Sequence, residues 1–243
     1  MITSEELSQF LASRRTTRSF LPKPVDPEII DAILTDAMTA PSWSNTRGYM
    51  VGIATGEKRD RISRELLRRW WLLAEGRKGG LLGKLKLLFT WDGLPISDYR
   101  IVRPYPKELR VRSGRVGKEL YGLLGIDRGD AQARDAQWAK NYEFFGAPVA
   151  LFIFTHKGLD EYSVSDAGLF MQNLMLSAHA RGLGSCAQGA VAIWAKAIRR
   201  EFKVPKGYKL LTGIAIGYRS DDVVNTFQAN RPDIAEIKLE SAS

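Results

Sequence analysis

The stretch Ser13-Arg14-Arg15-Thr16-Thr17-Arg18-Ser19-Phe20 holds three arginines within five residues and has no carboxylate among them. An unpaired guanidinium group is costly to bury, so arginines placed between helices need a counter-charge. The planar guanidinium fork suits phosphate and also planar carbonyl or ring-nitrogen acceptors. The stretch therefore indicates an anion site, and a solvated basic turn is the alternative for the arginines taken alone.

A second polar stretch, Pro41-Ser42-Trp43-Ser44-Asn45-Thr46, supplies hydroxyls, an amide and an indole. These groups suit the polar edge and the face of a flat heterocycle. A helix is predicted between the two stretches, because Asp26 can cap it, Pro27 fits its first turn and Pro41 ends it. With both stretches present, the solvated-turn interpretation becomes the weaker one.

These two stretches resemble the flavin-dependent nitroreductase family. Its proteins open with Arg-Arg-Ser-x-Arg-x-Phe and continue, after a helix, with Pro-Ser-x-x-Asn. Here the matching residues are Arg14 to Phe20 and Pro41 to Asn45. The family usually continues with Gln-Pro, whereas this chain has Arg47-Gly48, a departure at the edge of the expected flavin site.

Three later regions extend the resemblance. Arg181-Gly182-Leu183-Gly184 and the residues after it look like the family's Gly-Leu-Gly loop, and Asn230-Arg231-Pro232 resembles its closing motif. The run from Tyr121 to Phe145-Gly146-Ala147-Pro148 is similar to the nitroaromatic-reducing branch, such as the nitrobenzoate reductases. The resemblance is loose from 57 to 103.

The resemblance implies an α+β fold, with a mostly antiparallel sheet surrounded by helices and an intertwined homodimer. We expect a single domain over 1–243 with an inserted helical cover at about 57–140. It also implies an FMN-dependent oxidoreductase that passes electrons from NADPH or NADH to nitroaromatic or related aromatic acceptors by a ping-pong mechanism. Reductive dehalogenation and ene or quinone reduction on the same scaffold stay open as alternatives.

The same resemblance assigns roles to residues. Arg14, Arg15 and Arg231 would hold the phosphate and polar tail of FMN, and Arg18 would stabilise the reduced ring. The loop after Gly184 would approach the ring with its backbone. The remaining candidates are Thr16, Ser42, Trp43, Asn45, Gln188, Gly189 and Ala190 for the cofactor, and Tyr121, Phe144 and Phe145 for the substrate pocket. For either phenylalanine, core packing before a strand is at least an equal alternative.

A basic segment at 68–91 contains three tryptophans and several leucines. From Arg68 to Phe89 it has six Lys or Arg against one Glu. Such a segment suits a helical cover over the site or over a second subunit, which we favour, or a peripheral contact with an anionic membrane surface. Nucleic acid ranks third among the partners of this segment, because no nucleic-acid-binding motif accompanies it. We therefore expect no nucleic-acid partner.

The composition limits the remaining classes. The 243 residues are 44% hydrophobic, enough for one core, and the net charge is +9. One cysteine and two distant histidines argue against a disulfide framework and against a metal site. We expect Cys186 and His179 to be structural. No apolar run of membrane-spanning length and no leader pattern occurs, so we expect a cytoplasmic protein.

The chain also predicts its own elements. Thr3 and Glu6 form a capping box for a helix over 3–11. Strands are expected over 49–55, 149–155 and 210–218. A helix is expected over 130–145, and Asp166 is expected to cap the next one, which should be buried.

Overall fold

The fold is built on an antiparallel sheet, in a computed structural model that describes residues 2–80, 83, 95–101 and 103–241. Its strands are β1 (Tyr49–Thr55), β2 (Val149–His156), β3 (Gly184–Gln188) and β4 (Tyr208–Gly217). Their order is β1-β2-β4-β3, and every neighbouring pair is antiparallel. The expected α+β class with a mostly antiparallel sheet is confirmed.

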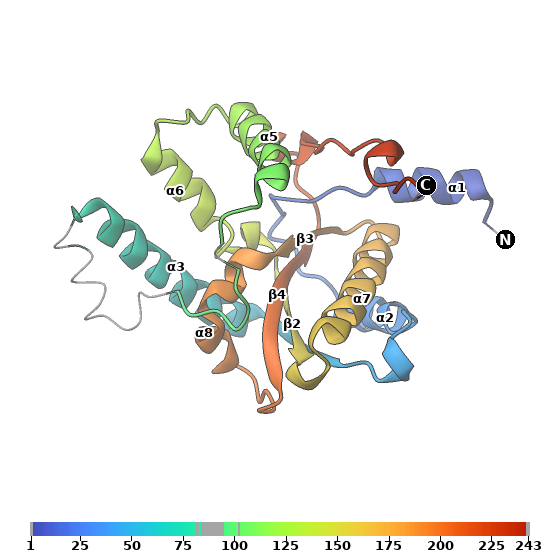
Figure 1. Cartoon of the computed structure of the whole chain (residues 1–243). Coiled ribbons are helices and arrows are strands. Elements are labelled where there is room, and N and C mark those ends of the chain that lie inside the picture. Colours follow the sequence, from blue (N-terminus) through green and yellow to red (C-terminus); the bar gives the residue numbers. More distant parts are fainter. Residues whose placement is uncertain (1, 81–82, 84–94, 102, 242–243) are drawn as a thin grey trace.

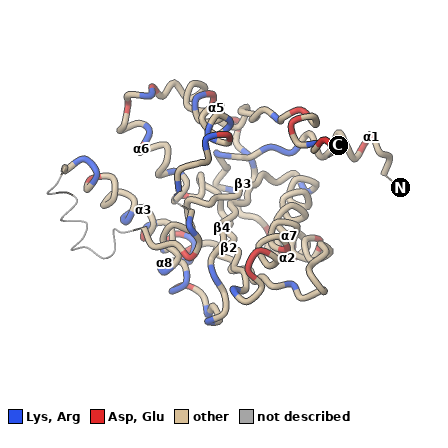
Figure 2. Tube along the Cα trace, viewed as in Figure 1, with Lys and Arg blue, Asp and Glu red and all other residues tan. Residues whose placement is uncertain are grey.

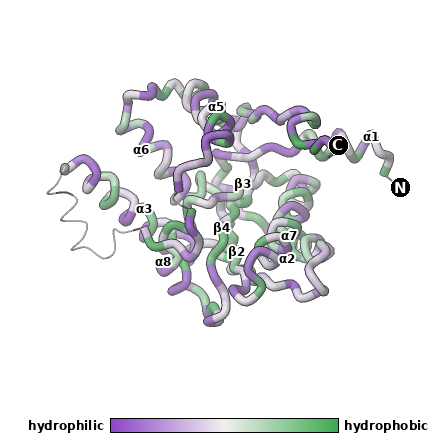
Figure 3. Tube along the Cα trace, in the orientation of Figure 1, coloured by the Kyte–Doolittle hydropathy of each residue, from purple (hydrophilic) through white to green (hydrophobic). Residues whose placement is uncertain are grey.

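Helices cover both faces of this sheet, because successive side chains of β2 point to opposite sides. Leu151 and Ile153 belong to one hydrophobic cluster, which contains residues of α2 (Pro27–Ala37) and α7 (Asp160–Ala180). Phe152 and Phe154 belong to the other, with residues of α3 (Gly56–Lys78) and α8 (Ala195–Arg199). Figure 1 shows the helices on either side of the sheet, and Figure 3 shows hydrophobic residues along the inner strands.

The remaining helices lie around this sandwich. They are α1 (Ser4–Ser13), α5 (Lys107–Leu123) and α6 (Ala131–Ala139). Neither α1 nor α5 has a buried residue, and α1 projects from the body of the molecule (Figure 1). Short 3-10 turns complete the chain at Trp43–Asn45, Phe144–Gly146, Lys157–Leu159, Gly189–Trp194, Val223–Thr226 and Ile234–Glu236.

Most predicted elements agree with the structure. The Thr3–Glu6 capping box is present, Asp26 accepts from the Glu28 N–H at the start of α2, and β1 spans Tyr49–Thr55 as predicted. Two predictions are wrong. The helix expected over 130–145 ends at Ala139, and Phe144 and Phe145 take the left-handed backbone conformation in a separate turn.

Asp166 does not cap a helix, because α7 already begins at Asp160. Asp166 lies inside α7 and is buried, and its Oδ1 accepts a hydrogen bond from the Trp43 N–H at 2.9 Å. The acidic residue that was expected to start α7 instead holds the loop that precedes β1.

Residues 57–140 contribute α3, α5 and α6 and no strand within the part that the structure describes. The described part of the basic segment is packed on the core: Trp70 is buried, and its Nε1 donates to the Asp135 carbonyl at 3.0 Å. This contact supports a cover rather than a membrane contact. Residues 81–82 and 84–91 of that segment lie outside the described residues. The insertion itself stays a prediction.

Basic residues are spread over several elements, including α3 and α8 (Figure 2). Among the described residues, no helix combines the length and the apolar character needed to cross a membrane.

Candidate functional site

The arginine stretch runs as an extended segment beside β3. Thr16 forms a parallel bridge with Ser185, and the Thr17 N–H donates to the Ser185 carbonyl at 3.0 Å. At its end, Phe20 forms an antiparallel bridge with Arg219, which follows β4. The segment is thus held between the edge of the sheet and the C-terminal tail.

Its side chains alternate in direction, as in any extended segment. Thr17 is buried against Gly184, where an added Cβ would lie 2.4 Å from the Thr17 Oγ1. This close approach requires glycine at 184. Because Thr17 faces the sheet edge, its neighbours Thr16 and Arg18 are directed away from it.

Asn225 fixes the position of Arg18. The buried Asn225 amide accepts a hydrogen bond from the Arg18 N–H at 2.7 Å and donates to the carbonyls of Ser19 and Ser220 at 2.8 and 3.0 Å. The Arg18 guanidinium lies 5.9 Å from the Phe227 ring centroid. The Asn225 side chain therefore joins the arginine segment to the tail and fixes the backbone position from which the Arg18 side chain extends.

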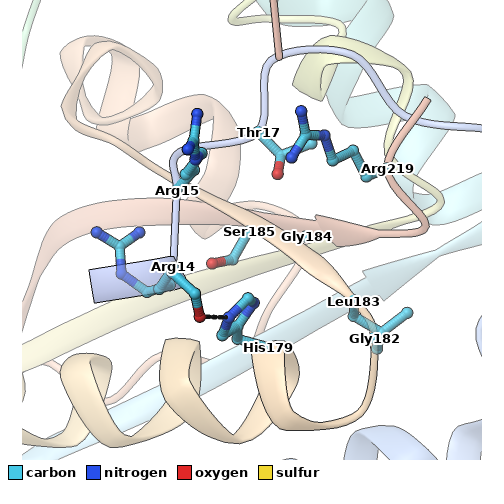
Figure 4. Close-up of a pocket in the computed structure, with 10 residues that line it drawn as sticks. Arg14, Arg15, Thr17, His179, Gly182, Leu183, Gly184, Ser185 and Arg219 are labelled. Atoms are coloured by element: carbon cyan, nitrogen blue, oxygen red, sulfur yellow. Dashed lines mark hydrogen bonds between the residues drawn. The ribbon is translucent and has the colours of Figure 1, made fainter. Parts of the chain in front are cut away.

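A small basic cavity of about 180 Å³ opens beside this segment. Figure 4 shows Arg14 and Arg15 from the segment, Arg219 after β4 and His179 at the end of α7 around it. No carboxylate of the described residues lines it; the lining residues are Ser13, Arg14, Arg15, Thr17, His179, Gly182, Leu183, Gly184, Ser185 and Arg219. This donor set fits a phosphate-sized anion.

Arg14 is the best-defined member of this set. Partial burial and then the positive charge of Arg231 lower the pKa of Arg14. The two guanidinium groups therefore repel each other, although they come from opposite ends of the chain. An anion between them would remove this repulsion, which fits the phosphate role expected for both.

His179 borders the same cavity. Its Nε2 lies 2.7 Å from the Ser13 Oγ, which also donates to the Phe10 carbonyl at 2.8 Å (Figure 4). Burial and the nearby Arg14 lower the pKa of His179. These contacts agree with the structural role that we expected for this histidine.

A large cavity of about 1160 Å³ brings together five of the predicted residues. Arg18 lines it from the extended segment, Tyr121 from α5, and Gln188, Gly189 and Ala190 from the end of β3. The run after Gly184, expected to be a flexible loop, is instead strand β3 up to Gln188, because it pairs with β4. The cavity is large enough for a flat ring system together with a second small ligand.

Gln188 offers an unused acceptor beside this cavity. Its side chain is buried, and Nε2 donates to the Asn141 carbonyl at 2.8 Å. Its Oε1 is buried without a hydrogen-bond partner within the described residues. Such an orphaned acceptor is costly unless a ligand supplies a donor.

Cys186 lies near Gln188 in β3. Burial raises the pKa of the Cys186 thiol to about 11, against the opposing effect of Arg18. A thiol in this state is a packing group and not a nucleophile.

Ser42, Trp43 and Asn45 lie at the opposite end of the sheet. Thr16 bridges Ser185, which pairs with Ile216 of β4, whereas Tyr49 pairs with Thr155, which pairs with Lys209. These two points of β4 are roughly seven residues, or about 23 Å, apart. Within one chain, the two polar stretches do not share a site.

The Ser42–Asn45 loop is nevertheless held in a defined shape. Ser42 Oγ accepts from the Arg47 N–H at 3.1 Å, and the Arg47 guanidinium donates to the Asn45 Oδ1. Trp43 is exposed and lies 4.3 Å from the Tyr162 ring, centroid to centroid. Arg47, which stands where the family usually has Gln, therefore leaves the Asn45 NH₂ group to face outward as a donor.

Gly48 explains the other half of this departure. A Cβ at this position would lie 2.9 Å from the Leu159 Cδ1 and 3.2 Å from the Ser163 Cβ. A side chain at position 48, such as the proline that the family usually has here, would therefore require the side chains of Leu159 and Ser163 to shift.

Phe144 and Phe145 do not line the large cavity. Both are buried in the core cluster, and Phe144 packs edge-on against Phe152 at a centroid distance of 5.9 Å. Their contacts match the alternative we left open, packing before a strand.

The sequence reasoning missed several residues that shape both cavities. Asn225 and Arg219 act through tertiary contacts that the sequence around them does not predict. Trp70 and Trp138 line the large cavity with rings 6.0 Å apart, and their spacing within two separate helices gave no joint signal.

Comparison with known proteins establishes the class to which this fold and site belong. The nitroreductase family profile matches residues 11–218, so the chain belongs to the nitroreductase family. The described residues contain no group of three His, Cys, Asp or Glu that could hold a metal ion.

Individual relatives match over nearly the whole chain. A 4-nitrobenzoate reductase of Pseudomonas putida is 31% identical, covering 95% of this chain and 93% of its own length. A nitrobenzene nitroreductase of Ectopseudomonas oleovorans is 29% identical over 99% and 96%. The crystal structure of the FMN and NADPH-dependent nitroreductase NfnB from Sphigopyxis sp. strain HMH superposes with a TM-score of 0.82, at 28% identity over 97% and 99% of the two chains.

Proposed function

We propose that this protein is an FMN-dependent oxidoreductase that transfers electrons from NADPH or NADH to nitroaromatic acceptors by a ping-pong mechanism. The observation that carries the proposal is the large cavity, which joins Arg18 to Gln188, Gly189 and Ala190. The family membership and the named relatives support the same activity.

The residues present fit FMN. Arg14, Arg15 and Arg231 would hold its phosphate, because Arg14 and Arg231 repel each other and the described residues place no carboxylate in the lining of the small basic cavity. Thr16 would contribute its hydroxyl to the polar tail. Bound FMN would supply the hydride and electron chemistry of the reaction.

The chain supplies binding, orientation and charge. Arg18 places a guanidinium at the cavity wall, where it would stabilise negative charge on the reduced cofactor. Gln188 Oε1 would accept a hydrogen bond from the ligand, because the hydrogen bond from Nε2 to the Asn141 carbonyl fixes the orientation of the amide. Trp70, Trp138 and Tyr142 give the cavity an aromatic wall for a flat acceptor.

The proposal includes an intertwined homodimer. Ser42, Trp43 and Asn45 would reach the flavin site of the partner chain, because they lie at the wrong end of the sheet for their own. The exposed apolar face of α1, with Leu7 and Leu11, supports a second subunit. So do the exposed Ile234, Ile237 and Leu239 of the tail.

Steady-state kinetics test this function. We expect the oxidation of NADPH or NADH to depend on an added nitroaromatic, with parallel double-reciprocal lines as the fixed substrate is varied. The lines are parallel because one cavity serves donor and acceptor in turn. Intersecting lines would contradict the single shared cavity, and no nitroaromatic-dependent oxidation by flavin-loaded protein would contradict the function.

A further inference from the structure

The charges around the large cavity are strongly unequal. Among the residues that the structure describes, four guanidinium groups line it, from Arg18, Arg77, Arg103 and Arg134, against one carboxylate, that of Asp135. Arg18 belongs to the proposed flavin edge. The other three lie toward the walls formed by α3, α6 and the segment before α5.

Asp135 does not balance all three. Its Oδ1 accepts from Arg77 at 3.0 Å, and its Oδ2 lies 3.6 Å from the Lys78 Nζ. The Asp135 carboxylate is thus already shared by two cations. Arg77 also lies 4.8 Å from the centroid of the Trp70 ring, which fixes it against the cavity wall.

The exposed side chains of Arg103 and Arg134 have no counter-charge among the residues that the structure describes. Arg134 donates to a neutral acceptor, the Arg128 carbonyl, at 2.9 Å. The Arg103 backbone N–H donates to the Ile101 carbonyl at 3.1 Å, whereas its guanidinium makes no hydrogen bond or ion pair with the residues that the structure describes. Two uncompensated cations at the wall of one cavity attract an anionic ligand.

The aromatic wall defines the rest of that ligand. Arg134 and Trp138 are one turn apart on α6, so their side chains share a face with Cβ atoms about 5–6 Å apart. Trp138 is stacked near Trp70, with ring centroids 6.0 Å apart. The distance between Arg134 and Trp138 suits a small aromatic ligand, whose ring would stack on the Trp138 indole while its acidic group contacts the Arg134 guanidinium. It is short for the long arm between the nicotinamide and the 2′-phosphate of NADPH.

We propose that Arg103 and Arg134 form an anion subsite that selects aromatic carboxylates as acceptors. The proposal rests on the proposed function, because the acceptor is the second ligand of that cavity. Such a subsite would distinguish this chain from enzymes that reduce uncharged acceptors, for example a nitrobenzene.

The test compares 4-nitrobenzoate with methyl 4-nitrobenzoate, which has the same ring and nitro group without the charge. The variants are Arg103→Gln, Arg134→Gln and the pair together, since glutamine removes the charge but keeps a polar side chain and, at 134, the helix propensity of α6. The matched control is Arg64→Gln, exposed on α3 and outside the lining of the cavity. The readouts are kcat/KM and the equilibrium Kd, followed by protein or flavin fluorescence, in flavin-loaded protein.

We expect the double variant to lower the acid-to-ester ratio of kcat/KM, and of affinity, about tenfold or more, as for the loss of a charge-assisted hydrogen bond. The Arg64→Gln control should keep the wild-type ratio. A double variant with the wild-type ratio would overturn the proposal. A second result would also overturn it: a double variant whose bound flavin is reduced more slowly by NADPH, but not by NADH, while the acid-to-ester ratio is unchanged. The arginines would then bind the 2′-phosphate of the electron donor.

Failure of the proposed function gives a different result. Wild-type protein that reduces neither compound would contradict the nitroreductase activity, yet the Kd ratio would still decide the anion subsite. A preference for binding the acid that is lost in the double variant supports the subsite, and equal binding of acid and ester overturns it.

Discussion

Arg14 and Arg231 show how single residues organise the cofactor site. Each lies in an extended or irregular part of the chain, and the charge of Arg231 lowers the pKa of Arg14, although only Arg14 is among the residues that line the small basic cavity. The free energy that this repulsion costs is recovered when an anion binds.

The first prediction concerns Arg231. Arg231→Ala should raise the Kd of FMN about ten- to a hundredfold, because a hydrogen bond to a charged group is worth about 1.5–3 kcal/mol. Riboflavin, which has no phosphate, should lose much less affinity. Flavin fluorescence titration measures both, and equal losses for the two ligands would remove Arg231 from the phosphate site.

The second prediction concerns Gly184. Gly184→Ala would bring a Cβ to 2.4 Å from the Thr17 Oγ1 and 2.9 Å from two further Thr17 atoms. We expect a loss of about 1–3 kcal/mol in the free energy of unfolding, from overpacking at the sheet edge. Urea unfolding measures it.

Gly114→Ala on α5 is the matched control for this change. Its added Cβ would meet no atom within 4 Å, so we expect a gain of about 0.5–1 kcal/mol from helix propensity. Wild-type stability in Gly184→Ala would show that the arginine segment is not held as tightly as its contacts with β3 indicate.

At the level of elements, local signals were sufficient wherever a cap or a continuous apolar run set the boundary. Thr3 and Glu6 placed the start of α1, Asp26 and Pro27 that of α2, and the apolar run placed β2. Asp166 misled the prediction, because its partner, the Trp43 N–H, lies far away in sequence. The unpaired Gln188 Oε1 likewise became visible only with its tertiary surroundings.

The third prediction concerns the contact between α2 and α7. Hydrogen bonds from Ser177 at 2.6 Å and Arg181 at 2.7 Å lower the pKa of Asp36 below its usual 3.8. The stabilisation is therefore present above pH 3.8 and is lost as the pH falls through the lowered value. The difference in unfolding free energy between wild type and Asp36→Asn should therefore decrease as the pH falls.

Urea unfolding at a series of pH values measures this difference. Asp31→Asn, exposed on the same helix, gives the background effect of removing a carboxylate from α2. A difference for Asp36→Asn that stays constant down to the lowest pH would contradict the role of its charge in joining the two helices.

At the level of the whole molecule, the sheet separates the two polar stretches that the sequence linked. The two stretches carried the resemblance, and the register of β4 places them apart within one chain, which fits the intertwined homodimer that the resemblance implies. The residue roles assigned to FMN stay predictions that the geometry makes specific.

The fourth prediction concerns the assembly. Leu7→Asp with Leu11→Asp should convert a dimer to a monomer, because both side chains are exposed on α1 and would be buried by a partner. Light scattering after size-exclusion chromatography measures the mass. Wild-type protein with the mass of one chain would contradict the homodimer and the shared flavin site.

The most direct measurement is the absorbance spectrum of the purified protein, loaded with FMN and kept free of oxygen. We expect a flavin spectrum that bleaches on addition of NADPH or NADH and recovers on addition of 4-nitrobenzoate. A protein that takes up no FMN, or one whose bound flavin is not reduced by either nicotinamide, would contradict the proposed flavin-dependent electron transfer.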